Sequence, residues 1–209
     1  NSPRATYDHA RLQALATGYK PGSPLLPQAF EALEHARAVP GSGILPHSAL
    51  LILAARSDSP IRDAWWDDML ARLRGHRVGV QEIGSIASLT RCARDGTCAF
   101  PPEAMLATYQ AALAGQGRKA ELYNLYADYV SNVMLRPELA LHLWQRAIAA
   151  SPHEPQYRIN RARLLIAMGR EREAREEIAA LRAMGRMDSN EQAARELEAR
   201  LAKRKRDHG

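Results

Sequence analysis

The stretch that decides the fold is residues 137–152, PELALHLWQRAIAASP. Ala140, Trp144 and Ala147 lie four and three positions apart, which is the period of one face of a helix. Proline stands at both ends of the segment, where it can begin a helix or stop one. The small side chain lets a neighbouring helix approach, and the tryptophan fills the space beside it. The segment therefore predicts a helix that packs on one face.

Helical periodicity continues on both sides of this segment, and no stretch shows the sustained alternation of a half-buried strand. The sequence therefore predicts an all-α fold. Short connections between the helices indicate antiparallel neighbours, that is, a row of hairpins. Glycines and prolines divide the chain into predicted helices near residues 8–18, 24–38, 46–57, 60–74, 81–91, 101–114, 119–134, 137–150, 155–168, 171–184 and 189–205.

The spacing of the quoted segment recurs further along the chain. Ala174 lies 34 positions after Ala140, and Ile178 and Leu181 follow it at intervals of four and three. Self-similarity at such a period indicates stacked helix hairpins. The pattern resembles the tetratricopeptide repeat (TPR), whose second helix carries a small residue, a large apolar or aromatic one, then alanine, and a closing proline such as Pro152.

The resemblance is confined to the second half of the chain. Residues 119–154 and 155–188 resemble a TPR hairpin, and residues 79–117 do so weakly. No repeat is recognisable before residue 79. The predicted organisation is an N-terminal helical portion of about four helices over residues 1–78, TPR-like hairpins over residues 79–188, and a capping helix with a basic tail over residues 189–209.

Two departures from the family pattern stand out in the TPR-like hairpins. The residues LYNL at 122–125 look like the opening of the family's first helix, but Ala140 follows two residues later than usual. We place the extra length at 134–137. In the next hairpin, Arg161 stands where the family has a leucine.

The resemblance implies an α-solenoid whose first helices line a groove that binds a peptide or protein segment. Asn124 and Asn160 occupy equivalent positions, and their amides can both donate to and accept from a peptide backbone. An alternative is that these asparagines only bridge neighbouring helices. Transferred position by position, the expected groove residues are Tyr123, Asn124, Ala127, Ile159, Asn160 and Arg163.

The expected ligand of this groove is neutral and partly apolar. Some members of the family grip a C-terminal carboxylate with lysines, but Tyr123 and Asn190 occupy the positions that would supply them. Arg163 is the cation placed to meet an acidic partner.

The two cysteines, Cys92 and Cys98, lie six positions apart around a turn signal, Asp95-Gly96. We favour a structural disulfide, which persists in an oxidising compartment. The predicted location is therefore periplasmic or extracytoplasmic. Two free thiols in a cytoplasmic protein are the second choice. Two ligands alone do not make a zinc site, and the spacing is too long for a Cys-x-x-Cys redox pair.

No catalytic, metal or cofactor-binding set is recognisable in the sequence. The seven histidines form no His-x-x-x-His or His-Glu-x-x-His pair, and there is no phosphate-loop or dinucleotide fingerprint. Asp63, Asp67 and Asp68 cluster beside Trp65, where we interpret them as the solvated flank of a helix. His47 is interpreted as part of a helix entry turn. We therefore expect a protein that is not an enzyme and that needs no cofactor.

The chain carries a formal net charge of +6, and part of the surplus lies in the run KRKR at 203–206. Such a run can attract the phosphates of nucleic acid or of lipids. We favour the simpler interpretation, a solvated helix end whose cations suit the helix dipole. Nucleic acid is therefore not an expected partner.

A weaker resemblance concerns the context of the chain. The segments GILPH at 43–47, AWW at 64–66 and SLTRC at 88–92, followed by Cys98, look like the soluble C-terminal region of proteobacterial multi-span membrane proteins that act as glycosyltransferases or assemble polysaccharides. The chain begins at Asn1 without a methionine, so we expect a processed chain or a piece of a larger protein.

The sequence thus predicts a non-catalytic interaction or scaffold module of the bacterial cell envelope that binds a protein segment in a TPR groove. The alternative is a soluble periplasmic domain of a membrane glycosyltransferase or polysaccharide-assembly protein. Such a domain would contact glycan or its own upstream membrane part.

Overall fold

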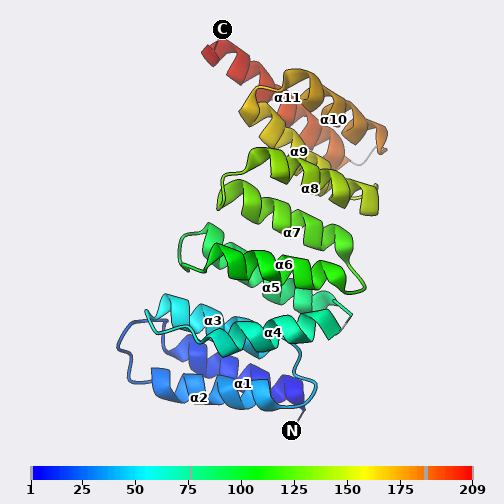
Figure 1. The fold of residues 1–209 in the computed structure, drawn as a ribbon. Coiled ribbons are helices and arrows are strands. Elements are labelled where there is room, and N and C mark those ends of the chain that lie inside the picture. Colours follow the sequence, from blue (N-terminus) through cyan, green and yellow to red (C-terminus); the bar gives the residue numbers. More distant parts are fainter. Residues whose placement is uncertain (1, 76, 186–187, 209) are drawn as a thin grey trace. The chain divides into compact units, whose positions relative to one another are not determined.

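The computed structural model describes residues 2–75, 77–185 and 188–208, and within them every regular element is a helix (Figure 1). The predicted all-α class is thereby confirmed. The chain divides into two compact units, Asn1–Arg118 and Lys119–Gly209, called here the N-terminal and the C-terminal unit. The weak TPR-like segment 79–117 therefore belongs to the N-terminal unit.

The N-terminal unit is organised around α3. This helix packs against α1 and α2, which precede it in the sequence, and against α4 and α5, which follow it. α4 also packs against α6. The helices of this unit are α1 (Pro3–Ala16), α2 (Leu26–Ala38), α3 (Leu45–Arg56), α4 (Asp63–Gly75), α5 (Val80–Arg94) and α6 (Pro102–Ala114).

The C-terminal unit is a succession of packed helix pairs. α7 packs along α8, α8 contacts α9, α9 packs along α10, and α11 lies against both α9 and α10. Ala162, Ala174, Ile178 and Leu197 meet in the apolar core that joins the last three helices. The helices are α7 (Lys119–Asn132), α8 (Pro137–Ala150), α9 (Pro155–Met168), α10 (Glu171–Ala183) and α11 (Asp188–His208).

Proline lies in the first two positions of six of these helices, because its fixed φ suits the first turn and its missing N–H is not needed there. α1 begins five residues before the predicted start, because Pro3 is its first residue and the hydroxyl of Ser2 accepts from the backbone N–H of Ala5 at 3.2 Å. The prolines at the first or second helical position are Pro3, Pro27, Pro46, Pro102, Pro137 and Pro155.

The connection between α7 and α8 spans residues 133–136. Leu135 has a φ of 54° in this connection, and its side chain is exposed. A left-handed conformation is uncommon for residues other than glycine. It lets the chain reverse between Asn132 and Pro137 without lengthening either helix.

Among the described side chains of the basic run at the end of α11, that of Arg204 makes a structural contact. Arg204 donates from Nη1 to the carbonyl oxygen of Ala167 at 2.7 Å, in the last turn of α9. α9 then ends at Gly169, whose φ of 77° is the left-handed C-cap conformation that glycine favours. The guanidinium thus satisfies a carbonyl at the negative end of a helix. The side chain of Lys205 lies outside the described residues.

Both tryptophans of α4 are core residues. Trp65 stacks on Phe30 with ring centroids 5.9 Å apart, and Trp66 meets Phe100 edge to face at 5.7 Å. Both indoles are almost completely buried. They therefore hold α4 against α2 and against the segment before α6.

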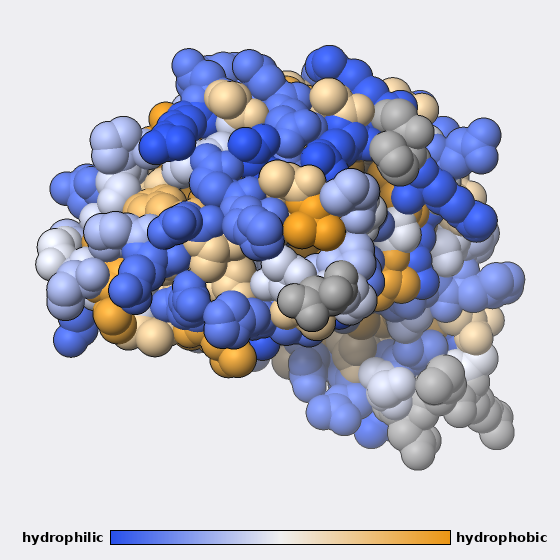
Figure 2. Space-filling model, turned by 90° about the horizontal axis from the view of Figure 1, so that it is seen from below, coloured by the Kyte–Doolittle hydropathy of each residue, from blue (hydrophilic) through white to orange (hydrophobic). Residues whose placement is uncertain are grey.

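The surface shown in Figure 2 is predominantly hydrophilic, with hydrophobic residues in small separate groups. Isolated apolar side chains of this kind are normal on soluble surfaces. Among the described residues, no helix is both long enough and apolar enough to cross a membrane.

Candidate functional site

The predicted groove residues lie on α7 and α9, and the two equivalent asparagines contact each other. Asn160 donates from Nδ2 to Oδ1 of Asn124 at 3.0 Å. The same oxygen accepts from Nε1 of Trp144 on α8, also at 3.0 Å. Asn124 therefore joins three helices, because one carbonyl oxygen uses both of its acceptor positions. The sequence alternative that these asparagines bridge neighbouring helices is therefore observed.

The bridge still leaves hydrogen-bonding capacity for a ligand. Gln156 donates to Oδ1 of Asn160 at 2.8 Å, which fixes that amide from the other side. Nδ2 of Asn124 has no partner within the described part of the chain. The amides are thus held in fixed orientations and retain donors, which is the arrangement that a backbone carbonyl of a bound segment requires.

The other expected groove residues differ in their exposure. Arg163 is exposed and has no ion-pair partner in the described residues, whereas Tyr123 is half-buried under the guanidinium of Arg146, 5.1 Å from its ring centroid. Ile159 is partly buried against the core of the last three helices. The prediction for Ala127 needs correction. This residue has no exposed surface, so it packs inside the unit and cannot line a groove.

Arg161, the departure from the family's leucine, pairs with a buried carboxylate. Arg161 and Arg158 on α9 both contact Glu177 on α10, the latter at 3.0 Å. The Glu177 side chain is only 10% exposed. Nε of each arginine is buried without a hydrogen-bond partner among the described residues. The two cations therefore depend on one carboxylate, so its loss would leave two poorly solvated charges.

The N-terminal unit contains a polar cluster that the sequence did not reveal. Nε2 of His47 on α3 and Nη1 of Arg37 on α2 both contact Oδ2 of Asp68 on α4, at 2.7 and 2.8 Å. Arg72, one turn further along α4, reaches the other carboxylate oxygen at 3.4 Å. Asp68 is thus a junction of three helices, unlike the solvated flank expected from its neighbours.

The protonation states in this cluster follow from its burial. Burial alone would raise the pKa of Asp68, but the hydrogen bonds from His47 and Arg37 lower it to about 2. Burial also lowers the pKa of His47. Nδ1 of His47 is buried with no partner in the described residues, so a proton there would be an unsatisfied donor. His47 is therefore neutral and donates from Nε2. Because its side chain is 0% exposed, it has no surface on which to meet a substrate.

A second carboxylate beside this cluster, that of Glu34, lines a cavity of about 570 Å³ between α2 and the start of α4. Oε1 of Glu34 accepts from Nε1 of Trp65 at 2.7 Å and from Arg62 at 3.3 Å. Oε2 of Glu34 pairs with Arg37 at 2.7 Å. Oε1 thus accepts two hydrogen bonds and Oε2 one within the chain, so this carboxylate holds α2 against the start of α4.

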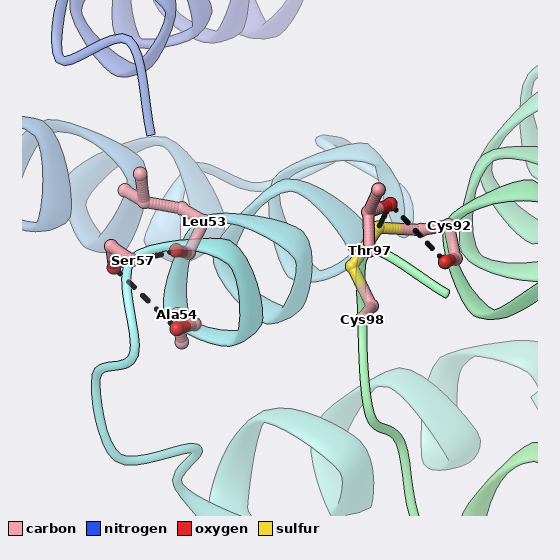
Figure 3. Close-up of a disulfide and its surroundings, with 6 residues drawn as sticks. All are labelled: Leu53, Ala54, Ser57, Cys92, Thr97 and Cys98. Carbon is pink, nitrogen blue, oxygen red and sulfur yellow. Dashed lines mark hydrogen bonds between the residues drawn. A yellow bond between two sulfur atoms is a disulfide. The ribbon is translucent and has the colours of Figure 1, made fainter. Parts of the chain in front are cut away.

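The predicted disulfide between Cys92 and Cys98 is present, with 5.2 Å between the Cα atoms (Figure 3). α5 extends three residues beyond its predicted end, so Cys92 lies within its last turns. The carbonyl oxygen of Cys92 accepts from the backbone N–H groups of Thr97 and Cys98, both at 3.1 Å, and from the Thr97 hydroxyl at 3.2 Å. The loop is therefore fixed by hydrogen bonds as well as by the covalent bond.

Histidine, cysteine and carboxylate side chains form no group of three that could hold a metal ion within the described residues. Comparison with family models, with curated proteins and with solved structures found no match to this chain.

Proposed function

We propose that this chain is a non-catalytic interaction module and that its C-terminal unit binds a protein segment along α7 and α9. The observation that supports this most directly is the Asn124–Asn160 hydrogen bond. It aligns two amides on neighbouring hairpins and leaves donors on them. Arg163, one turn beyond Asn160 on α9, supplies a cation without an intramolecular partner in the described residues.

The proposal includes a TPR-like stacking of the hairpins. Within the C-terminal unit, α11 lies against both helices of the preceding hairpin, as the first helix of a further repeat would. The Cys92–Cys98 disulfide supports an extracytoplasmic location, since such bonds persist mainly in oxidising compartments.

A selection of short random peptides on the full chain, followed by calorimetry, tests the proposed binding face. We expect Asn160→Ala to weaken a selected peptide about three- to tenfold, because a net hydrogen bond contributes about 0.5–1.5 kcal/mol. We expect Arg163→Ala to weaken an acidic peptide about two- to fivefold.

Arg200→Ala is the matched control for these variants. Arg200 is an exposed arginine of the same unit with no ion-pair partner in the described residues. Selected peptides that bind all three variants as tightly as the unsubstituted chain would contradict the proposed site. So would a selection that recovers no peptide.

A further inference from the structure

A separate hollow of about 180 Å³ lies in the N-terminal unit among α1, α3 and α5. α3 packs against both other helices, and all three contribute residues to the lining. The hollow exists because small residues meet there, namely Ser48 and Ala49 on α3 and Gly84 and Ser85 on α5. Its volume equals the liquid volume of about six water molecules, enough for a single side chain.

Two features of α5 indicate that this hollow is built to take a ligand group. Ser85 is 2% exposed, and its hydroxyl has no hydrogen-bond partner in the described residues. A buried hydroxyl without a partner costs free energy that a ligand can recover. A Cβ atom on Gly84 would meet nothing within 4 Å, so the hollow is open beside this residue.

The charge in the lining of the hollow is positive. Arg11 lines it, and Arg56 stacks on the ring of Tyr19, another lining residue, at 4.1 Å. Neither arginine has a carboxylate partner in the described residues. No Asp or Glu is among the lining residues. The next carboxylate along α1, Asp8, is engaged by Arg4 at 3.0 Å.

The rim of the hollow is apolar. Leu15 on α1 lines it with 44% of its surface exposed, and Ile52 on α3 lies opposite in the same lining. Tyr7 completes the lining on α1, and burial raises the pKa of its phenol. It therefore stays neutral at pH 7 and can donate a hydrogen bond.

We propose that this hollow is a docking pocket for an acidic protein segment, which inserts one aliphatic side chain and presents a neighbouring carboxylate to Arg11 and Arg56. The apolar rim covers the aliphatic group, and the hydroxyl of Ser85 bonds to the backbone of the segment. This pocket is distinct from the face along α7 and α9 and involves none of its residues.

The test uses the full chain, ¹⁵N-labelled, and three acetylated and amidated tripeptides followed by NMR. We expect Glu-Leu-Glu to give saturable shifts at the backbone amides of Gly84 and Ser85. We expect Gln-Leu-Gln to bind about two- to fivefold more weakly, because exposed ion pairs contribute little. We expect Glu-Ala-Glu to bind about tenfold more weakly or worse, because it lacks the buried alkyl group.

Two variants serve as controls. Gly84→Leu fills the hollow with a better helix former, and we expect it to keep the native spectrum and lose the shifts. Arg11→Gln alters an exposed side chain, and we expect it to reduce the difference between Glu-Leu-Glu and Gln-Leu-Gln, since Arg56 remains. Asn160→Ala, in the other unit, leaves these shifts unchanged.

Three outcomes would overturn the proposal: equal binding of the charged and neutral peptides, full binding to Gly84→Leu, or no saturable shift at α5. None of them bears on the face along α7 and α9. If inorganic phosphate competes with Glu-Leu-Glu at equal concentration, the hollow binds a phosphate group, and the proposed acidic segment is likewise wrong.

Discussion

Reducing the Cys92–Cys98 disulfide is expected to destabilise the N-terminal unit by an amount that follows from its short loop. The cysteines are six residues apart, and the chain-entropy relation gives about 2 kcal/mol for a loop of that length. The hydrogen bonds to the carbonyl oxygen of Cys92 remain after reduction. The native loop should therefore persist, and the loss should come mainly from the unfolded state.

The size of the melting shift also reports how the chain unfolds. Unfolding entropy is about 2.1 cal/mol/K per residue. If the N-terminal unit, Asn1–Arg118, unfolds alone, reduction should lower its Tm by about 8 °C. If all 209 residues unfold together, the decrease should be about 5 °C. Calorimetry thus separates one cooperative transition from two.

The assay compares scanning calorimetry of the chain with and without a phosphine reductant, after thiol titration has confirmed each state. Cys92→Ala/Cys98→Ala is the control, and reductant should leave its Tm unchanged. Free thiols in the native, unreduced protein would refute the pairing itself. A Tm that moves by less than about 1 °C on complete reduction would refute the loop-entropy argument.

Three further predictions concern single side chains. Burial holds the pKa of His47 below its ordinary 6.5, so as pH falls the unfolded chain binds a proton before the folded chain does. The unfolding free energy should therefore fall as pH drops through about 6.5. His47→Gln should flatten this pH dependence, measured by urea titrations. Glu177→Ala should cost about 3 kcal/mol by stranding two arginines, whereas Glu176→Ala, on the surface, should stay within about 0.5 kcal/mol. Trp144→Phe should cost about 1–2 kcal/mol in the same titrations, because Asn124 loses a donor.

The helices could be predicted from sequence because their signals are local. Proline at the start of α8 and α9, glycine at the end of α9, and apolar spacing along each helix all lie within a few residues of what they determine. The disulfide was predictable for the same reason, since a turn signal separates two cysteines six positions apart. Helix ends were less certain, as at α5, which continues past Cys92.

The polar clusters could not be predicted, because their partners are distant in sequence. Asp68 meets His47 across 21 positions and Arg37 across 31. Only the packing of α2, α3 and α4 brings them together, and hydrophobic periodicity says nothing about which polar side chains then meet. Arg161 was recognised as a departure from a family pattern, but Glu177 as its partner required the contact between α9 and α10.

The asparagines illustrate an intermediate case. Their equivalent positions in successive hairpins were readable from the repeat spacing. Their hydrogen bond was one of two alternatives, and Asn160 does donate to Asn124. A pattern could indicate that both face the same side, but the rotamer that brings the amides within 3.0 Å depends on Trp144 and Gln156.

The contact of Arg204 with the end of α9 couples the basic tail to the stability of that helix. Its guanidinium donates to the carbonyl of Ala167, so an anion that draws Arg204 away from α9 leaves this carbonyl without its donor. Anion binding at the tail and capping of the last turn of α9 are therefore linked equilibria, and each must oppose the other by the same free energy. High salt screens exposed charges, so it would weaken both anion binding at the tail and the contact of Arg204 with the end of α9.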